Sequence, residues 1–474
     1  MSVMDSPPIK SPSLLHSALT FAVVIALIAL GLFWFAIDLH ALMFLCLIWT
    51  GSNAYLLGAD FTQIRQYMSE AISRALPAIY IFILIGMVIA SFMHAGTIAA
   101  LMYYGLNWIS PALFLPLGML LCAFMSVATG TSWGTVGTLG VVFIGIGSAM
   151  GMPLPLVAGM VVCGATFGDK MSPVSDTTNL AAMSAGTNLY HHIYSMTFTT
   201  IPTFLLALVI FLFIGFGYGD SELSIGELNT IQQALADSYR LTPAITLLPI
   251  VVLAGCSLRR LPPEISMSAS VLTAVFIAVL FQGDRADVVL NALWANTPGD
   301  TGIANVDELL GRGGIYSMSW TLLLAIMALA LGGIMHSTGF LRCLLAGLIA
   351  RVQHAAALVG STIGTGLIGN MAMGEAYISI ILNCQLFRDK YQQEGLDSAV
   401  LSRSVEEGAT LTTGLIPWTT AGAFYTATLG IPVLDYAPYA FFNYLNAVVA
   451  IAFAALGIGL LRDSPESKVA RDST

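Results

Sequence analysis

Long apolar stretches follow one another along almost the whole chain, and short polar segments separate them. They cover residues 18–37, 41–58, 76–93, 111–150, 154–186, 191–216, 242–257, 264–282, 318–335, 355–387, 402–429 and 436–461. Because about 20 apolar residues are enough for a helix to cross a bilayer, most of these stretches predict single membrane-spanning helices. Segments 111–150 and 355–387 are longer and have a polar, glycine-rich centre. Each of the two therefore predicts a re-entrant hairpin, whose non-helical tip must be covered by protein or by a water-filled cavity.

Similar motifs recur in the same order in the two halves of the chain, which indicates an internal duplication. The matching pairs are residues 85–96 with residues 328–339, the Gly-Ala-Thr triplets at Gly164 and Gly408, and Pro173 with Pro417. The predicted units are N-terminal helices 1–75, a first repeat 76–216 (hairpin 111–150, broken helix 154–186), linking helices and loops 217–317, a second repeat 318–461 (hairpin 355–387, broken helix 402–429) and a tail 462–474.

The charges in the loops predict how these segments are oriented. Lysine and arginine favour the cytoplasmic side of a membrane in short loops. Arginines precede the first repeat and separate the halves, whereas loops 219–238 and 283–312 are acidic. If residues 97–109 and 340–352 are interfacial helices, the charges predict about ten spans, inverted repeats and both termini in the cytoplasm. If those two segments cross the membrane instead, the count is twelve and the repeats are parallel.

Composition narrows the class of protein. Hydrophobic residues make up 57% of the chain and charged residues only 9%, against about a quarter in soluble domains, which predicts an all-α polytopic protein of the lipid bilayer. The net charge of −9 lies mostly in loops without a basic patch, so nucleic-acid binding is excluded. The sequence contains no phosphate-binding loop, dinucleotide motif or nucleophile–base pattern, so neither an enzyme nor a cofactor is predicted. His191 and His192 lack the further ligands of a zinc site, so no resident metal is predicted either.

A polar run in the first predicted broken helix is the strongest candidate for chemistry. Carboxylates at membrane depth are costly and usually mark ion or proton sites, and Pro173 interrupts the helix and frees backbone oxygens. Asp169 stands next to Lys170 and could form a neutralised pair with it, whereas Asp176 has no basic neighbour and is the stronger candidate. Oxygen ligands suit a hard cation such as Na⁺. The candidate cation or proton ligands are Asp169, Ser172, Ser175, Asp176, Thr177, Thr178 and Asn179, with Thr129, Thr131, Ser132 and Thr135 from the first hairpin tip.

The second half offers a matching set of polar residues. Glu375, in an apolar hairpin, is a candidate proton carrier because burial favours its neutral form. Glu406 and Glu407 point about 100° apart on a helix, so at most one is expected to face a site, and Glu407 is favoured because it precedes the repeated triplet. The candidate substrate or proton residues are Asn370, Glu375, Glu407, Thr410, Thr412, Thr413, Trp418, Thr419 and Thr420.

These motifs resemble those of a known transporter family. The run Gly168-Asp-Lys-Met-Ser-Pro-Val-Ser-Asp-Thr-Thr-Asn-Leu-Ala181 is very similar to the signature of the NhaC family of Na⁺/H⁺ antiporters, and residues 131–135 and 415–418 are similar to its accompanying motifs. The second half departs from the pattern, with Thr419 in place of Asn and with residues 374–377 differing at the hairpin. The resemblance implies inverted repeats, re-entrant hairpins, an elevator-like motion and a homodimer, as in the ion-transporter superfamily.

Two functions follow from this resemblance and from the residues. The first is a secondary antiporter of the bacterial inner membrane, in which Na⁺ competes with H⁺ at the buried carboxylates Asp169 and Asp176. The second is a Na⁺- or H⁺-coupled carrier or exchanger of a small organic acid or amino acid, with the altered second half contacting the solute. In both cases Na⁺ and H⁺ are transported substrates. A channel is less consistent with broken helices in a duplicated chain, which are typical of alternating access.

Overall fold

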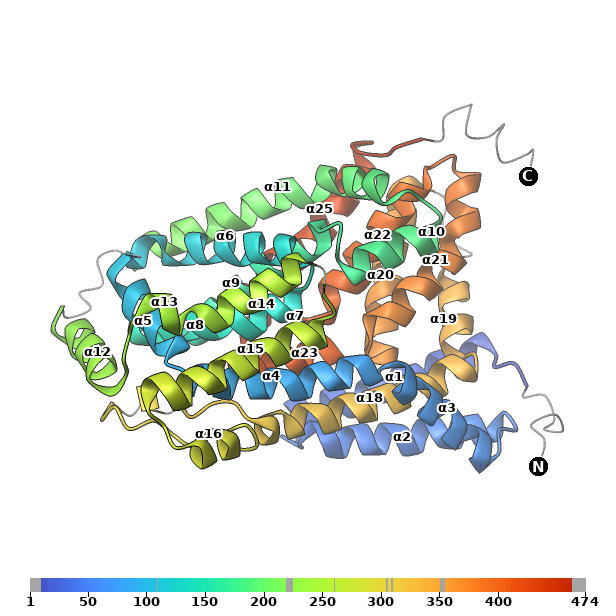
Figure 1. The fold of residues 1–474 in the computed structure, drawn as a ribbon. Coiled ribbons are helices and arrows are strands. Elements are labelled where there is room, and N and C mark those ends of the chain that lie inside the picture. The colour runs from blue at the N-terminus through green and yellow to red at the C-terminus, as the bar shows by residue number, and fades with distance from the viewer. Residues whose placement is uncertain are drawn as a thin grey trace.

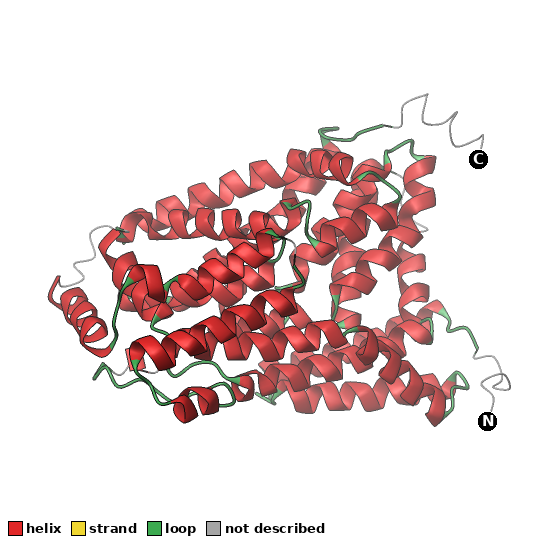
Figure 2. Ribbon diagram, in the orientation of Figure 1, coloured by secondary structure: helices red, strands yellow, loops and turns green. Residues whose placement is uncertain are grey.

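The computed structural model describes residues 10–108, 110–218, 225–259, 261–303, 306–307, 310–349 and 354–462. Within these ranges the chain is helical and forms no strand, apart from one isolated β-bridge between Leu396 and Arg462. Most of the long helices run in a similar direction (Figure 2). The all-helical polytopic class predicted from the apolar stretches is therefore confirmed.

The first half of the chain contains a pair of N-terminal helices, a hairpin and a broken helix. Its elements are α1 (Leu14–Phe33), α2 (Leu39–Leu56), α3 (Phe61–Arg74), α4 (Leu76–His94), α5 (Thr97–Trp108), α6 (Pro111–Thr129), α7 (Ser132–Thr135), the π-helical turn η1 (Val136–Gly140), α8 (Val141–Ala149), α9 (Leu154–Met171), α10 (Asp176–Ala185) and α11 (Leu189–Phe216).

The second half repeats this order after a group of linking helices. The linking elements are α12 (Ile225–Ser238), α13 (Pro243–Thr246), α14 (Leu248–Leu258), α15 (Pro263–Ile277), η2 (Ala278–Gln282) and α16 (Ala286–Ala292). The second repeat contains η3 (Ile315–Met318), α18 (Ser319–Ser337), α19 (Phe340–Ile349), α20 (Ala355–Met373), α21 (Ala376–Gln393), α22 (Ser398–Thr413), α23 (Thr420–Leu429), α24 (Val433–Tyr436), η4 (Ala437–Tyr439) and α25 (Phe441–Ala455).

Each repeat contains a hairpin and a broken helix at the positions that the sequence indicates. The first hairpin turns at Gly130 and the second at Gly374, and both glycines adopt the left-handed conformation, with φ of 72° and 66°. The first broken helix is interrupted between α9 and α10, and the second between α22 and α23. Pro173 and Pro417 lie in these interruptions and supply no backbone N–H to continue the helix.

Two boundaries in the second repeat differ from the prediction. Helix α21 continues to Gln393, beyond the predicted end at 387, and α22 begins at Ser398 rather than at 402. The α21 extension consists mainly of polar residues, which an apolar pattern does not include, whereas the α22 extension is the short run from Ser398 to Leu401. The start of α22 is fixed by Asp397, whose carboxylate accepts a hydrogen bond from the backbone N–H of Ala399 at 2.7 Å.

The two repeats run in opposite directions through the molecule (Figure 1). Helix α4 leads away from the end that carries both termini and is followed by α5 at the far end, whereas α18 leads back and is followed by α19 beside the termini. The hairpin of α6, α7 and α8 starts and finishes at the far end, and the hairpin of α20 and α21 starts and finishes at the terminal end. The arrangement is the inverted duplication predicted from the loop charges.

Helices outside the repeats pack against the repeat of the opposite half of the chain. Helices α2 and α3, which precede the first repeat, pack against α18 of the second. The linking helix α15 packs in turn against α4 of the first repeat (Figure 1). Each repeat is thus supported by helices that belong to the opposite half of the chain.

The repeated glycine of each broken helix allows close packing against its hairpin. A methyl group at Gly164 of α9 would collide with the backbone carbonyl of Met119 in α6, and one at Gly408 of α22 would collide with that of Ile363 in α20. The repeated Gly-Ala-Thr triplet is therefore a packing feature. It fixes each interrupted helix against the first arm of its hairpin.

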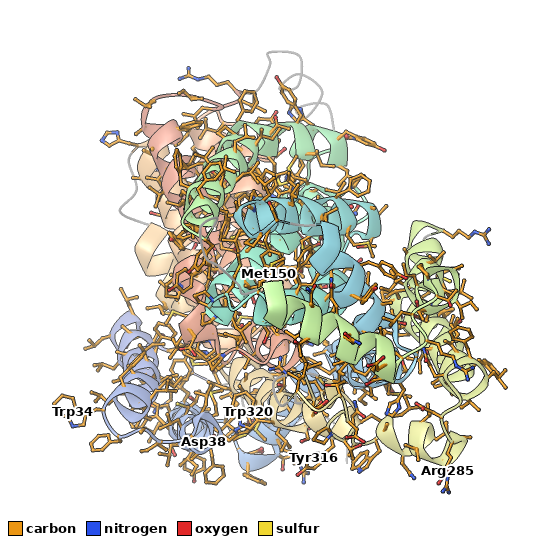
Figure 3. All side chains as sticks on the ribbon, turned by 90° about the vertical axis from the view of Figure 1, so that its left-hand side faces the viewer. Trp34, Asp38, Met150, Arg285, Tyr316 and Trp320 are labelled. Carbon is orange, nitrogen blue, oxygen red and sulfur yellow. The ribbon has the colours of Figure 1, made fainter. Side chains whose placement is uncertain are left out.

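Within the described residues, nine helices are long and apolar enough to cross a membrane, and up to twelve segments are if each bent helix pair counts as one span. The predicted ten and its alternative of twelve both fall in this range. Trp34, Tyr316 and Trp320 are 80%, 64% and 42% exposed and lie in the lower part of the view in Figure 3. Exposed tryptophan and tyrosine side chains are typical of the membrane–water interface.

Candidate functional site

Asp169 is the centre of the polar contacts in the first repeat. It lies near the end of α9, is only 9% exposed, and receives three hydrogen bonds. Its Oδ2 accepts from the backbone N–H of Ser132 at 3.1 Å and from the Ser132 hydroxyl at 2.6 Å. Its Oδ1 accepts from the Ser175 hydroxyl at 2.6 Å. One carboxylate thus joins the tip of the first hairpin to the interruption of the first broken helix.

The other candidate hydroxyl and amide groups of the first repeat have different partners. Thr177 contacts Ser175, which in turn contacts Asp169: the Thr177 Oγ1 lies 3.1 Å from the hydroxyl oxygen of Ser175. The remaining groups donate to or cap the backbone around the site: Thr129 to Met125, Ser172 to Val127, Thr178 to Asp169 and Lys170, Asn179 to Pro173 and Ser175, Thr135 to Thr131, and Thr131 as the N-cap of α7. These residues shape the site, and Ser132 and Ser175 form its inner contacts.

Asp176 occupies a different position from the one expected. It is exposed at the first turn of α10, and its carboxylate forms no hydrogen bond with any described residue. Its charge acts on Tyr377, which lies at the start of α21 and also feels the charges of Glu375 and Asp169. Asp176 therefore borders the region between the two hairpin tips, and the structure favours Asp169 as the central carboxylate.

The second repeat builds a matching arrangement around its own tip. Glu375 is 8% exposed and caps α21 by accepting a hydrogen bond from the N–H of Ile378 at 3.3 Å. The backbone N–H of Thr420 donates to the Gly374 carbonyl at 2.8 Å, which joins the tip to the second interruption. Thr419 caps α23 by accepting from the N–H of Gly422 at 3.1 Å.

Asn370 and its neighbours fix the second hairpin against α22. The side-chain amide of Asn370 donates to the Ala409 carbonyl at 2.6 Å and to the Thr412 hydroxyl at 3.0 Å. The indole N–H of Trp418 donates to the carbonyl of Met371 at 2.8 Å. The Asn370 carbonyl oxygen and the hydroxyls of Thr410 and Thr413 are buried and have no hydrogen-bond partner among the described residues.

An aromatic cluster joins the two repeats beside these tips. Trp133 of the first tip stacks on Phe424 of α23 with ring centroids 4.7 Å apart, and Phe82 of α4 packs edge-on against both. Helix α10 also packs against α21 and α22. The two interruptions and the two hairpin tips therefore meet in one region. The indole ring of Trp133 is a packing element of that region.

A second group of charged residues lies behind Asp169 and was largely missed by sequence reasoning. Lys170, His192, Arg403, Glu406 and Glu407 are all fully buried, between α9, α11 and α22. Lys170 forms no ion pair with its neighbour Asp169 in the described structure, because consecutive helical side chains diverge, and it feels the charges of Glu406 and Glu407. Both glutamates are fully buried, although they lie at successive positions of α22.

Comparison with known proteins identifies the family. The family model described as "Na+/H+ antiporter family" matches residues 164–458. The chain belongs to this Na⁺/H⁺ antiporter family. The match begins at the repeated glycine of α9 and ends beyond α25, so it contains Asp169, the second hairpin and the second broken helix. The resemblance based on the signature run is confirmed.

Individual relatives of this antiporter family member align over most of their length. The Na(+)/H(+) antiporter NhaC of Alkalihalophilus pseudofirmus is 34% identical over 95% of this chain and 97% of its own. The arginine/ornithine antiporter ArcD of Halobacterium salinarum is 33% identical over 98% and 96%, and the malate-2H(+)/Na(+)-lactate antiporter of Bacillus subtilis is 32% identical over 85% and 86%. The family thus includes exchangers named for cations, for amino acids and for organic acids.

Proposed function

We propose that this protein is a secondary antiporter that exchanges Na⁺ for H⁺ across the bacterial inner membrane, with both termini in the cytoplasm. The observation that carries the proposal is the buried carboxylate of Asp169, held by Ser132 of one hairpin tip and Ser175 of the adjoining interruption. Na⁺ binds between these three groups. Family membership and the relatives named as Na⁺/H⁺ antiporters support the same assignment.

The chemistry of the three groups suits a hard cation. A carboxylate supplies the negative charge, and a serine hydroxyl can either donate its proton to that carboxylate or rotate and offer its oxygen to a cation. The backbone N–H of Ser132 keeps its contact with Oδ2 in both arrangements and fixes the position of the carboxylate. Asp176, exposed at the border of the region, attracts cations towards the inner site.

The inverted repeats supply a means of alternating access. Both interruptions lie where the two halves meet, and each adjoins a hairpin that enters from the opposite end of the molecule (Figure 1). A site at the junction of such elements can open to one side at a time when one part rocks or slides against the other. Competition between Na⁺ and H⁺ then converts a proton gradient into Na⁺ movement.

Replacement of Asp169 by Asn tests the assignment. The variant keeps the size of the side chain but lacks the charge that holds Na⁺, so Na⁺-driven proton flux in everted membrane vesicles should be abolished while the protein remains inserted. The matched control is Asp176→Asn, which should retain exchange with a weaker apparent Na⁺ affinity. Full exchange in Asp169→Asn would contradict the assignment.

A second candidate function is exchange of a small organic acid or amino acid coupled to Na⁺ or H⁺. Two observations favour it: the relatives named for malate, lactate, arginine and ornithine, and the unpaired buried polar atoms of Asn370, Thr410 and Thr413 near the second tip. In proteoliposomes, malate, lactate and arginine are offered separately with ²²Na⁺. A solute that stimulates ²²Na⁺ uptake supports this function, and uptake that none of them changes argues against it.

A further inference from the structure

The buried charged residues behind Asp169 contain several polar atoms with no hydrogen-bond partner among the described residues. They lie between the end of α9, the first turns of α11 and the middle of α22, and their side chains are completely buried. The atoms are Lys170 Nζ, His192 Nε2, Arg403 Nε, both carboxylate oxygens of Glu406 and Glu407 Oε2. Buried polar atoms without partners are rare in native proteins and require an explanation.

One part of this group is a structural ion pair. Glu407 Oε1 accepts a hydrogen bond from the Thr199 hydroxyl at 2.5 Å and lies 3.8 Å from Arg403 Nε. The guanidinium of Arg403 also donates to the backbone carbonyls of Ser195 and Gly459, each at 3.0 Å. Glu407 and Arg403 thus neutralise each other and tie α22 to α11 and to the chain after α25.

Glu406 faces His192, and both side chains are fully buried. His192 Nδ1 lies 2.6 Å from the Ser402 hydroxyl, and that hydroxyl also lies 3.1 Å from the Ala399 carbonyl. The other ring nitrogen of His192, Nε2, lies 3.7 Å from Glu406 Oε2. The imidazole of His192 therefore lies beside both Ser402 and Glu406 of α22.

No described residue donates a hydrogen bond to either carboxylate oxygen of Glu406. The contact with His192 becomes favourable when the pair holds one proton more than a neutral imidazole and an ionised carboxylate, either as the neutral acid of Glu406 or as the imidazolium of His192. Without that proton, a bare carboxylate would be buried with no donor, which is strongly unfavourable.

We propose that the Glu406–His192 pair holds the proton that is exchanged for Na⁺, so that Na⁺ and H⁺ bind at different carboxylates. The inference rests on the proposed function, in which Na⁺ binds at Asp169. The two sites are coupled by charge, because the carboxylates of Asp169 and Glu406 are close enough to act on each other electrostatically. No proton has to move from one site to the other.

The charges of the buried region explain the coupling. With the pair protonated and neutral overall, the negative charges of Asp169 and Glu407 balance the positive charges of Lys170 and Arg403. Na⁺ at Asp169 adds one positive charge, and release of the proton from the pair removes it again. A net charge in a buried site is unfavourable, so each ion is favoured by the absence of the other.

Other titratable groups also lie around Glu406. Helix α21 contributes Cys384 and Tyr391, whose interactions involve the charges of Glu406 and Glu407 respectively, and both side chains are neutral when protonated. Helix α9 contributes Asp169 and Lys170, and α22 itself contributes Arg403 and Glu407. His192 on α11 is the group in contact with Glu406.

The test is the dependence of Na⁺ affinity on pH, measured with ²²Na⁺ on the purified full-length protein in detergent. Where the pair is protonated, the wild type should bind Na⁺ about tenfold more weakly for each unit that the pH falls. Glu406→Gln should bind Na⁺ with little dependence on pH. The control Glu394→Gln removes a partly exposed carboxylate that pairs with Lys390 outside the buried group, and it should keep the slope.

The outcomes separate this inference from the proposed function. A slope that persists unchanged in Glu406→Gln would overturn the inference, because the competing proton would then lie elsewhere. Loss of Na⁺ binding in Asp169→Asn supports the Na⁺ site, and retained binding there would remove the proposed function itself. If Glu406→Gln does not fold, His192→Gln provides the second variant. It should shift the midpoint of the pH dependence by about one unit, and an unshifted midpoint would equally overturn the inference.

Discussion

The hydroxyls around Asp169 allow a quantitative prediction about Na⁺ affinity. Ser132 and Ser175 each place an oxygen 2.6 Å from the carboxylate, on opposite oxygens of the group. Replacement of either serine by alanine removes a polar contact to a charged group, which contributes about 1.5–3 kcal/mol. Because each serine oxygen is assigned as a ligand in the Na⁺-bound state, its loss should lower the affinity for Na⁺ about 10- to 150-fold. Ser132→Ala retains the backbone N–H contact and should lie at the lower end of this range.

The assay is the apparent Michaelis constant for Na⁺ in everted vesicles, at a fixed pH and a matched level of inserted protein. Thr129→Val is the control, because its hydroxyl donates to the Met125 carbonyl within α6 and should leave the constant unchanged. The double variant Ser132→Ala, Ser175→Ala reports whether the two serines act on one ion. A change of less than twofold in both single variants would refute the assignment of these oxygens as Na⁺ ligands.

Two further predictions concern packing and an exposed loop. Gly408→Ala should reduce the stability of the detergent-solubilised protein by about 1–3 kcal/mol in a melting assay, because its methyl group meets the backbone of Ile363. In the control Gly364→Ala, the added methyl group meets no atom within 4 Å, so the stability should not fall. Slight burial tends to raise the pKa of Asp307, but hydrogen bonds from Thr301 outweigh it and keep that pKa below its usual range. The hydrogen bonds between Thr301 and Asp307 should therefore hold this loop in place at neutral pH. They should be lost as the pH falls from the usual aspartate range through the lowered pKa of Asp307, so that cleavage of the loop by an acid protease increases. Cleavage that does not change over this pH range, or that changes equally in Asp307→Asn, would contradict this prediction.

The hairpins and interruptions were predictable because glycine and proline mark them directly in the sequence. Gly130 and Gly374 are needed for left-handed turns, and Pro173 and Pro417 cannot continue a helix. The polar end of α21 was not predictable in the same way, because hydrophobicity does not indicate where a helix continues beyond the apolar region.

The charged residues behind Asp169 show what a linear pattern leaves out. Lys170 looked like the partner of Asp169 because the two are adjacent, yet side chains at successive helical positions face different neighbours. His192 was considered only as part of an incomplete zinc site, whereas the structure buries it fully against α22. Which charges meet depends on how α9, α11 and α22 pack together, and that packing joins residues more than 200 positions apart, as in the bond between His192 and Ser402.

The exchange of supporting helices between the halves has a consequence for biogenesis. During membrane insertion, α4 can pack against α15 only after the first repeat is complete, because α15 follows that repeat in the chain. Helices α2 and α3 reach the membrane early, but their contacts with α18 form only when the second repeat follows. Neither half can mature alone, so a truncated product should be recognised as incomplete and degraded by membrane quality-control proteases.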